Sequence, residues 1–250
     1  MGVLNLSAES PYDPSVYTDP DEAAVYVEEE LIGEGADIVD VGLESANKRF
    51  DVLDAAEELD QLAAAFEVID RVGEDVVWSI ETRYHEVAEV AIDGGFSMVN
   101  DICGFADPQM PVVCAERDVA VSKMASPPDL ERPGALESVE ALHEAIVREG
   151  LTEKTIVDPA FGGWSDGKTT AVDRETFRRL AEFTSYDRPV LVSINRKNFL
   201  REIAGRSTDQ ALAVSLAATA LAVRAGAKVI RTPEVLDTRG AGFVGSRARW

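Results

Sequence analysis

Eight short apolar runs rich in β-branched residues recur along the chain, and each ends in polar residues or glycine. Amphipathic stretches with helical spacing separate most of them. Strands and helices that alternate in this way are typical of a parallel sheet, and eight repeats in 250 residues predict a (β/α)8 TIM barrel. A doubly wound open sheet is the alternative. The predicted strands lie at residues 2–7, 36–45, 75–82, 96–104, 119–125, 154–162, 188–197 and 227–235.

The two ends of the predicted barrel are expected to be unusual. The chain begins inside its first strand, so we expect no N-terminal extension before the barrel. After the eighth strand, residues 236–250 hold three glycines, which predict an irregular last helix because glycine is a poor helix former. No linker or low-complexity segment interrupts the pattern, so we expect a single domain over residues 1–250.

The net charge of −22 comes from 46 acidic and 24 basic residues, and it limits the partners of the chain. Such a surface repels nucleic acid and anionic membranes. At molar salt the Debye length is only about 3 Å, so the repulsion among the acidic side chains is screened. The composition therefore favours a halophilic protein over an ordinary acidic one. The sequence has no long uncharged apolar run and no signal-peptide pattern at its start, so we expect a cytoplasmic protein without a membrane partner.

The cysteines and histidines are not expected to carry chemistry. Cys103 and Cys114 lack the spacing of a metal site or a disulfide framework, so we expect both to be small buried side chains. His85 and His143 lie in predicted helices beside acidic residues. We therefore expect solvated or packing roles for both, without general-base chemistry.

Polar residues at the ends of the predicted strands are the candidate site residues, because parallel barrels place their active sites there. Their mixture of amides, carboxylates and cations suits a heterocycle with N–H donors that also carries a phosphate group. For Asp40, Asp101 and Arg231 a purely structural role is an open alternative. The candidates are Asn5, Ser7, Asp40, Glu44, Ser45, Glu81, Asn100, Asp101, Lys123, Asp158, Asn195, Arg196, Lys197 and Arg231.

Six stretches of this sequence, in this order and at these spacings, resemble the dihydropteroate synthase family of pterin-binding barrels. They are MGVLNLS, GADIVDVGLES, GGFSMVNDICGFADPQM, TIVDPAFG, RPVLVSINRKNF and GAKVIRTPEV. The resemblance implies a transferase of folate biosynthesis. Such an enzyme condenses 4-aminobenzoate with 7,8-dihydropterin-CH2-pyrophosphate and releases pyrophosphate with the help of Mg2+. The resemblance also implies a homodimer formed through the last helices.

The resemblance implies a role for each matching residue. Asn5 would help to bind the Mg2+–pyrophosphate unit. Asn100 and Asp158 would bind the amino-pyrimidine edge of the pterin, Lys197 would close over its ring, and Arg231 would hold a phosphate oxygen. Asp158, Lys197 and Arg231 are then the catalytic residues. The residues that bind substrate are Ser45, Glu81, Asn100, Asp158, Lys197 and Arg231.

Several positions depart from the family pattern. Glu81 stands where the family has aspartate, Ala160 replaces a tight-turn glycine in a lengthened loop, and Lys123 stands where histidine is common. The stretch from Arg231 to Glu234 reads RTPE instead of RVHD, so a histidine that supports anion binding is missing. These departures leave two alternatives open: a noncatalytic pterin-binding paralogue or partner protein, and a pterin-dependent corrinoid methyltransferase.

Overall fold

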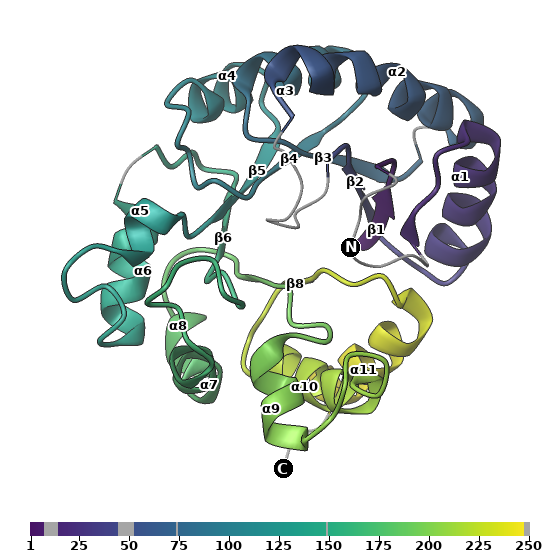
Figure 1. Ribbon diagram of the computed structural model, residues 1–250. Coiled ribbons are helices and arrows are strands. Elements are labelled where there is room, and N and C mark those ends of the chain that lie inside the picture. Colours follow the sequence, from purple (N-terminus) through teal and green to yellow (C-terminus); the bar gives the residue numbers. More distant parts are fainter. Residues whose placement is uncertain (8–14, 45–52, 74, 149, 248–250) are drawn as a thin grey trace. The chain divides into compact units, whose positions relative to one another are not determined.

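The computed structural model describes residues 1–7, 15–44, 53–73, 75–148 and 150–247, and the chain divides into two compact units (Figure 1). Unit 1 comprises Met1–Asp101, Asp107–Val121 and Pro233–Leu236. Unit 2 comprises Ile102–Ala106, Ser122–Thr232 and Asp237–Trp250. The expectation of a single domain stays a prediction.

Four parallel strands form the sheet of unit 1, and they pair in sequence order. They are β1 (Gly2–Asn5), β2 (Ile38–Gly42), β3 (Val77–Glu81) and β4 (Met98–Asp101). The register pairs Asn5 with Gly42, Gly42 with Glu81, and Glu81 with Asn100. The carboxyl ends of all four strands therefore lie at one edge of the sheet.

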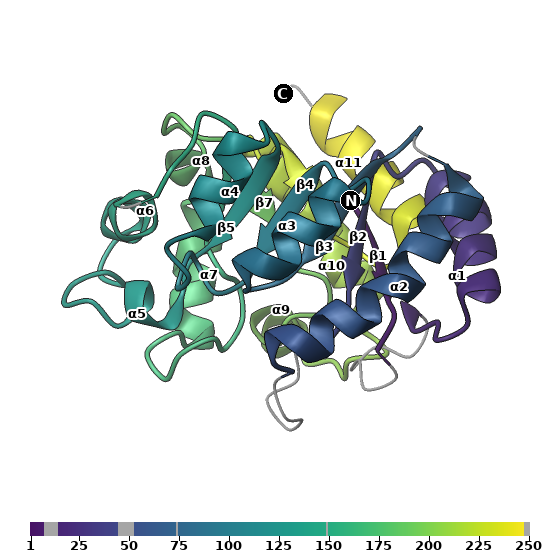
Figure 2. The same ribbon diagram turned by 90° about the horizontal axis from the view of Figure 1, so that it is seen from above.

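Helices of unit 1 follow these strands and lie along one face of the sheet, as Figures 1 and 2 show for α2 and α3. The first helix begins at Pro20, and the side chain of Asp19 caps its N-terminus. The helix at Met110–Glu116 was not predicted from the sequence. The helices are α1 (Pro20–Tyr26), the π-helical stretch η2 (Val27–Ile32), α2 (Ala55–Val72), α3 (His85–Asp93) and α4 (Met110–Glu116).

The remaining four strands continue the order. Strand β5 (Ala120–Met124) runs from unit 1 into unit 2, where the Ala125 N–H donates to the Asp158 carbonyl at 2.9 Å. Strand β6 (Thr155–Asp158) is followed by β7 (Leu191–Val192) and β8 (Val229–Ile230), which pair in parallel. A bridge between Val157 and Val190 joins the second and third of these strands. All eight predicted strands are present, although β7 and β8 are short.

The core of unit 2 is rich in phenylalanine. Phe161, in the loop after β6, stacks on Phe199 with ring centroids 5.6 Å apart, and Phe183 is fully buried in the same cluster. The helices are α5 (Pro127–Leu130), α6 (Val139–Val147), α7 (Thr170–Arg178), α8 (Leu180–Phe183), α9 (Asn198–Ala204), α10 (Leu212–Arg224) and α11 (Val235–Arg247). No helix in the described part of the chain is long and apolar enough to cross a membrane.

The prediction of an irregular last helix is wrong, because α11 is a regular helix of 13 residues. Packing accounts for at least one of its glycines. A Cβ atom at Gly245 would lie 2.2 Å from the Ala220 carbonyl oxygen of α10, so glycine allows the two helices to approach closely. Tertiary packing thus overrides the weak helix propensity of this segment.

Candidate active site

Asn5, Glu81 and Asn100 share one row across the sheet of unit 1, at the carboxyl ends of their strands. Side chains in one row of a parallel sheet point to the same face. The fourth member of the row is Gly42, where a Cβ atom would lie 3.0 Å from Asn5 Oδ1. The structure therefore brings three of the predicted site residues to one face, and the glycine leaves room between them.

The Asn100 amide is held by buried carboxylates. Asn100 Nδ2 donates to Asp40 Oδ2 at 3.0 Å and, more weakly, to Glu81 Oε2 at 3.5 Å. Ser79 Oγ donates to the other oxygen of Asp40 at 2.6 Å, and Asp40 is fully buried. Because several bonds fix this polar network, Asp40 orients Asn100, which agrees with the structural alternative for Asp40.

Asp158 occupies the end of β6 in unit 2 and is 6% exposed. The Ala160 N–H donates to Asp158 Oδ1 at 2.7 Å. Burial raises the pKa of Asp158 to about 6, although the Ala160 N–H and the cations Lys197, Lys168 and Arg231 oppose this effect. This carboxyl group therefore ionises just below neutral pH and, once ionised, can accept N–H bonds from a ligand.

Lys197 and Arg231 lie close enough to Asp158 to influence its charge, and all three belong to unit 2. Lys197 precedes α9, and its Nζ lies 5.4 Å from the centre of the Trp164 ring. Burial lowers the pKa of Lys197, Asp158 raises it, and Arg231 lowers it further. The structure thus gathers the three residues for which the resemblance implies catalytic roles.

Sequence reasoning missed a buried ion pair beside this set. Lys168 Nζ pairs with Asp173 Oδ1, and the two side chains are 0% and 2% exposed. Asp173 Oδ2 also accepts a bond from the Gly162 N–H at 2.8 Å. The pair therefore fixes both halves of the loop between β6 and α7. The only sequence signal was a lysine five residues before an aspartate, and the aspartate resembled an ordinary residue of a first helical turn.

Ala160 replaces the expected tight-turn glycine and keeps the conformation that glycine favours. Its φ angle is +57°, in the left-handed region that alanine rarely adopts. Ala160 is 1% exposed, and its N–H holds Asp158 in place. The turn is therefore retained at the cost of backbone strain.

Other candidates have structural partners. Glu44 forms an ion pair with Arg83 and accepts a bond from the Leu53 N–H at 3.1 Å. Lys123 is buried, and its Nζ donates to the Ile146 carbonyl at 2.6 Å near the end of α6. Ser45 lies outside the described residues. The position of Lys123 inside unit 2 gives it a packing role.

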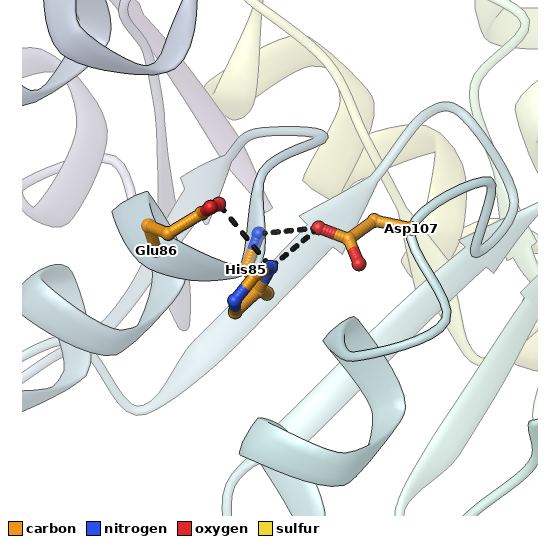
Figure 3. Close-up of side chains that lie close together, drawn as sticks. All are labelled: His85, Glu86 and Asp107. Carbon is orange, nitrogen blue, oxygen red and sulfur yellow. Dashed lines mark hydrogen bonds and ion pairs between the residues drawn. The ribbon is translucent and has the colours of Figure 1, made fainter.

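His85 is the first residue of α3, and Figure 3 shows it between Glu86 and Asp107. Asp107 Oδ2 accepts from the His85 backbone N–H at 3.1 Å and lies 2.7 Å from its Nδ1. Glu86 Oε2 lies 3.2 Å from the same ring nitrogen. The three residues could surround a metal ion. However, Asp107 already caps the helix, and the positive end of a helix dipole disfavours a cation.

His143 packs inside unit 2. Its ring stacks on Tyr186 with centroids 4.2 Å apart and contacts the edge of Phe183. Burial lowers the pKa of His143, so the ring favours its neutral form. Cys114 is also buried, as expected, and burial raises the pKa of its thiol to about 12.

Parallel strands that are followed by helices and end in carboxylates, amides and cations define an α/β barrel protein with polar strand ends. The chain belongs to the pterin binding enzyme family, whose model matches residues 1–233. This match confirms the family expected from the sequence motifs.

Named relatives support the same family. The chain is 33% identical over 262 residues to a probable bifunctional folylpolyglutamate synthase/dihydropteroate synthase of Halobacterium salinarum, covering all of this chain and 31% of that protein. It is 32% identical to an inactive dihydropteroate synthase 2 of Mycobacterium leprae, covering 96% of this chain and 86% of the relative. The chain thus spans about a third of the length of the haloarchaeal relatives it matches.

Solved structures confirm the (β/α)8 barrel fold. The dihydropteroate synthase of Coxiella burnetii in complex with pteroic acid has a TM-score of 0.81 and 29% identity, covering 98% of this chain and 91% of that one. The enzyme of Thermus thermophilus in complex with 6HMPPP has a TM-score of 0.79 and 32% identity, covering 100% and 93%.

Proposed function

We propose that this chain acts as a dihydropteroate synthase that joins 4-aminobenzoate to the methylene carbon of 7,8-dihydropterin-CH2-pyrophosphate. The observation that carries the proposal is the buried Asp158 with Lys197 and Arg231 beside it in unit 2. Structures of relatives support the substrate class, because they hold pteroic acid, 6HMPPP and 4-aminobenzoate.

The proposed pterin contacts follow from the chemistry of the amino-pyrimidine ring. Its N–C–N edge offers two N–H donors, which an ionised carboxylate can accept together. We assign this contact to Asp158, and the roles of Asn100 and Glu81 in substrate binding stay predictions of their own. Because only the ionised form of Asp158 accepts both bonds, the contribution of this contact to pterin affinity should rise with pH through about 6.

The reaction requires stabilisation of a leaving pyrophosphate. The amine nitrogen of 4-aminobenzoate forms a bond to the methylene carbon, the carbon–oxygen bond to pyrophosphate breaks, and the amine loses a proton. Arg231 and Lys197 would offset the negative charge that grows on the departing oxygens. The whole step needs no covalent bond to the protein.

Asn5 suits the proposed Mg2+ contact. Its Nδ2 donates to Ser15 Oγ at 2.7 Å, which fixes the amide and leaves its carbonyl oxygen as the ligand atom. Mg2+ prefers oxygen ligands and usually binds through few protein groups together with substrate phosphates. When bound, the ion would add charge stabilisation to the leaving pyrophosphate.

We also propose a homodimer formed through α10 and α11. Leu221, Phe243 and Val244 are 55%, 62% and 60% exposed on these helices of unit 2. Large apolar side chains that are exposed on a chain with a net charge of −22 favour a protein contact. A cytoplasmic location and adaptation to high salt are part of the same proposal, and the haloarchaeal relatives support the second.

A noncatalytic pterin-binding protein is the second candidate. It is favoured by the stretch Arg231 to Glu234, which lacks the histidine of the family pattern, and by the relative from Mycobacterium leprae, which is an inactive synthase.

The test is release of pyrophosphate from the pterin pyrophosphate, with Mg2+, 4-aminobenzoate and purified protein at high salt. We expect turnover that Asp158→Asn abolishes. The matched control is Asp166→Asn, which removes an exposed carboxylate from the same loop and should leave turnover unchanged. Pterin binding by calorimetry without turnover would support the noncatalytic candidate, and the absence of both would refute the two proposals.

A further inference from the structure

Glu58 is a buried carboxyl group on the apolar face of α2. It shares the core-facing stripe of this helix with Leu62, Ala65 and Ile69, and it is 0% exposed. A charged carboxylate in such a place is costly unless several donors satisfy it. The position therefore calls for a reason other than packing.

The two oxygens of Glu58 have different surroundings. Oε2 accepts a hydrogen bond from Thr82 Oγ1 at 2.5 Å. Oε1 is buried and has no hydrogen-bond partner among the described residues. A carboxylate with one donor is poorly satisfied, whereas a neutral carboxyl group places fewer demands on its surroundings. The geometry therefore favours a protonated Glu58.

Thr82 links Glu58 to the candidate site, because it directly follows Glu81 at the end of β3. The Thr82 hydroxyl also accepts from the Tyr84 N–H at 3.2 Å, so it fixes the turn that leads into α3. Glu81 is 7% exposed and contacts Asn100. Any shift of Thr82 would change the direction in which the Glu81 carboxylate points.

We propose that Glu58 is a positioning residue of the candidate site, a neutral carboxyl group that fixes Thr82 and thereby aims Glu81 at the substrate. The assignment of a substrate to Glu81 rests on the proposed function. The position of Glu58 on a core face, its bond to Thr82 and its unpartnered oxygen are independent of that function.

The proposal includes a pH dependence. Burial raises the pKa of Glu58 to about 7, the bond from Thr82 lowers it, and the charge of Glu81 raises it further. Glu81 is the ionisable group that acts on Glu58 from β3, while Asp54 and Glu57 of the same helix form its capping box. Above pH 7 a second charge therefore develops beside Glu81, and the Thr82 turn loses its neutral partner.

The first test measures the dissociation constant of the pterin pyrophosphate against pH by calorimetry at constant high salt. Above pH 6.5 Asp158 is mostly ionised, so a remaining change reports on another group. We expect wild-type Kd to rise about tenfold between pH 6.5 and 8.5, which corresponds to a coupling of about one pKa unit. Glu58→Gln stays neutral and should remove this rise. The control Asp60→Asn, an exposed acid on the same helix, should keep it.

A second variant separates positioning from folding. Glu58→Leu fills the apolar stripe of α2 but leaves the Thr82 hydroxyl without its acceptor. We expect this variant to unfold at a denaturant concentration at least as high as wild type at pH 8, yet to bind the pterin several-fold more weakly than wild type at pH 6.5. Glu58→Gln should bind as wild type does at pH 6.5. Equal binding by Glu58→Leu and wild type at pH 6.5 would overturn the proposal.

A measurement without ligand keeps this inference separate from the proposed function. In protein labelled with 13C at the glutamate carboxyl carbons, the Glu81 signal, assigned with Glu81→Gln, should show a second step near pH 7 that Glu58→Gln removes. If the wild type binds no pterin at any pH, the proposed function fails, and this titration alone then tests the coupling of Glu58 to Glu81. Absence of that step would refute the coupling of Glu58 to Glu81.

Discussion

Removing the cation of the buried Lys168–Asp173 pair should strongly destabilise unit 2. In Lys168→Met the Asp173 carboxylate, 2% exposed, keeps only the bond from the Gly162 N–H among the described residues. An unpaired buried charge of this kind costs about 3–5 kcal/mol, whereas breaking an exposed pair costs about 0.5 kcal/mol or less. The matched control is Arg178→Met, which breaks the pair between Arg178 and Glu175, whose side chains are 69% and 52% exposed.

The assay is denaturant unfolding followed by circular dichroism at fixed high salt. The double variant Lys168→Met/Asp173→Asn removes the unpaired charge but keeps a side-chain oxygen for the Gly162 N–H, so it should recover roughly 2 kcal/mol or more of the loss. A cost for Lys168→Met no larger than that of Arg178→Met would refute the reasoning. Strict additivity of the two single changes would refute it as well.

The pH dependence of the Lys168→Met variant gives an independent check. Burial raises the pKa of Asp173 and Lys168 lowers it, so loss of the lysine raises it further. When the pKa of a carboxyl group is higher in the folded than in the unfolded state, the protein loses unfolding free energy as pH rises through the folded-state pKa. The cost of Lys168→Met should therefore be smaller at pH 5 than at pH 8. An equal cost at both values would show that Asp173 is not the buried charge.

Four further substitutions have defined outcomes. Ala160→Gly relieves the strain of a left-handed φ of +57°, although glycine also increases the entropy of the unfolded chain. The change should raise the unfolding free energy by up to about 1 kcal/mol, and a lower melting temperature would contradict this. Gly245→Ala should cost about 1–3 kcal/mol because its Cβ would meet the Ala220 carbonyl, whereas Gly240→Ala, with open space around it, should gain up to about 1 kcal/mol in the same unfolding assay. Phe243→Glu should shift the protein from dimer to monomer in light scattering, and an unchanged mass would place the interface elsewhere.

The strands and the row of site residues on the first four of them could be predicted from the sequence. Each of the first four predicted runs contains its strand and extends past it, and Asn5, Glu81 and Asn100 were identified as strand-end residues before their register was known. The roles of these residues in binding stay predictions. Their common row follows from the parallel register. The periodic pattern implies parallel strands but does not tell which residues of neighbouring strands pair.

Burial of charged side chains could not be predicted, because it depends on contacts distant in the sequence. Glu58 lies in an acidic stretch and reads as a surface residue, yet it meets Thr82 of another element. Gly245 illustrates the same limit, since its effect on α11 depends on α10. Local propensity describes a segment in isolation, and packing decides which of its residues become costly or indispensable.

The acids that matter most to the proposed chemistry lower the stability of the fold at neutral pH. Burial raises the pKa of Asp158 from 3.8 to about 6 and that of Glu58 from 4.5 to about 7. Ionisation of each group therefore lowers the unfolding free energy by on the order of 3 kcal/mol. The pKa of each group is higher in the folded than in the unfolded protein. Its contribution to the unfolding free energy is therefore fully present below about pH 4 and is lost between pH 4 and 7. A pterin that donates two N–H bonds to ionised Asp158 would replace the hydration lost on burial. Ligand should therefore raise the melting temperature more at pH 7 than at pH 5, because the bound form requires the charge that the empty fold disfavours.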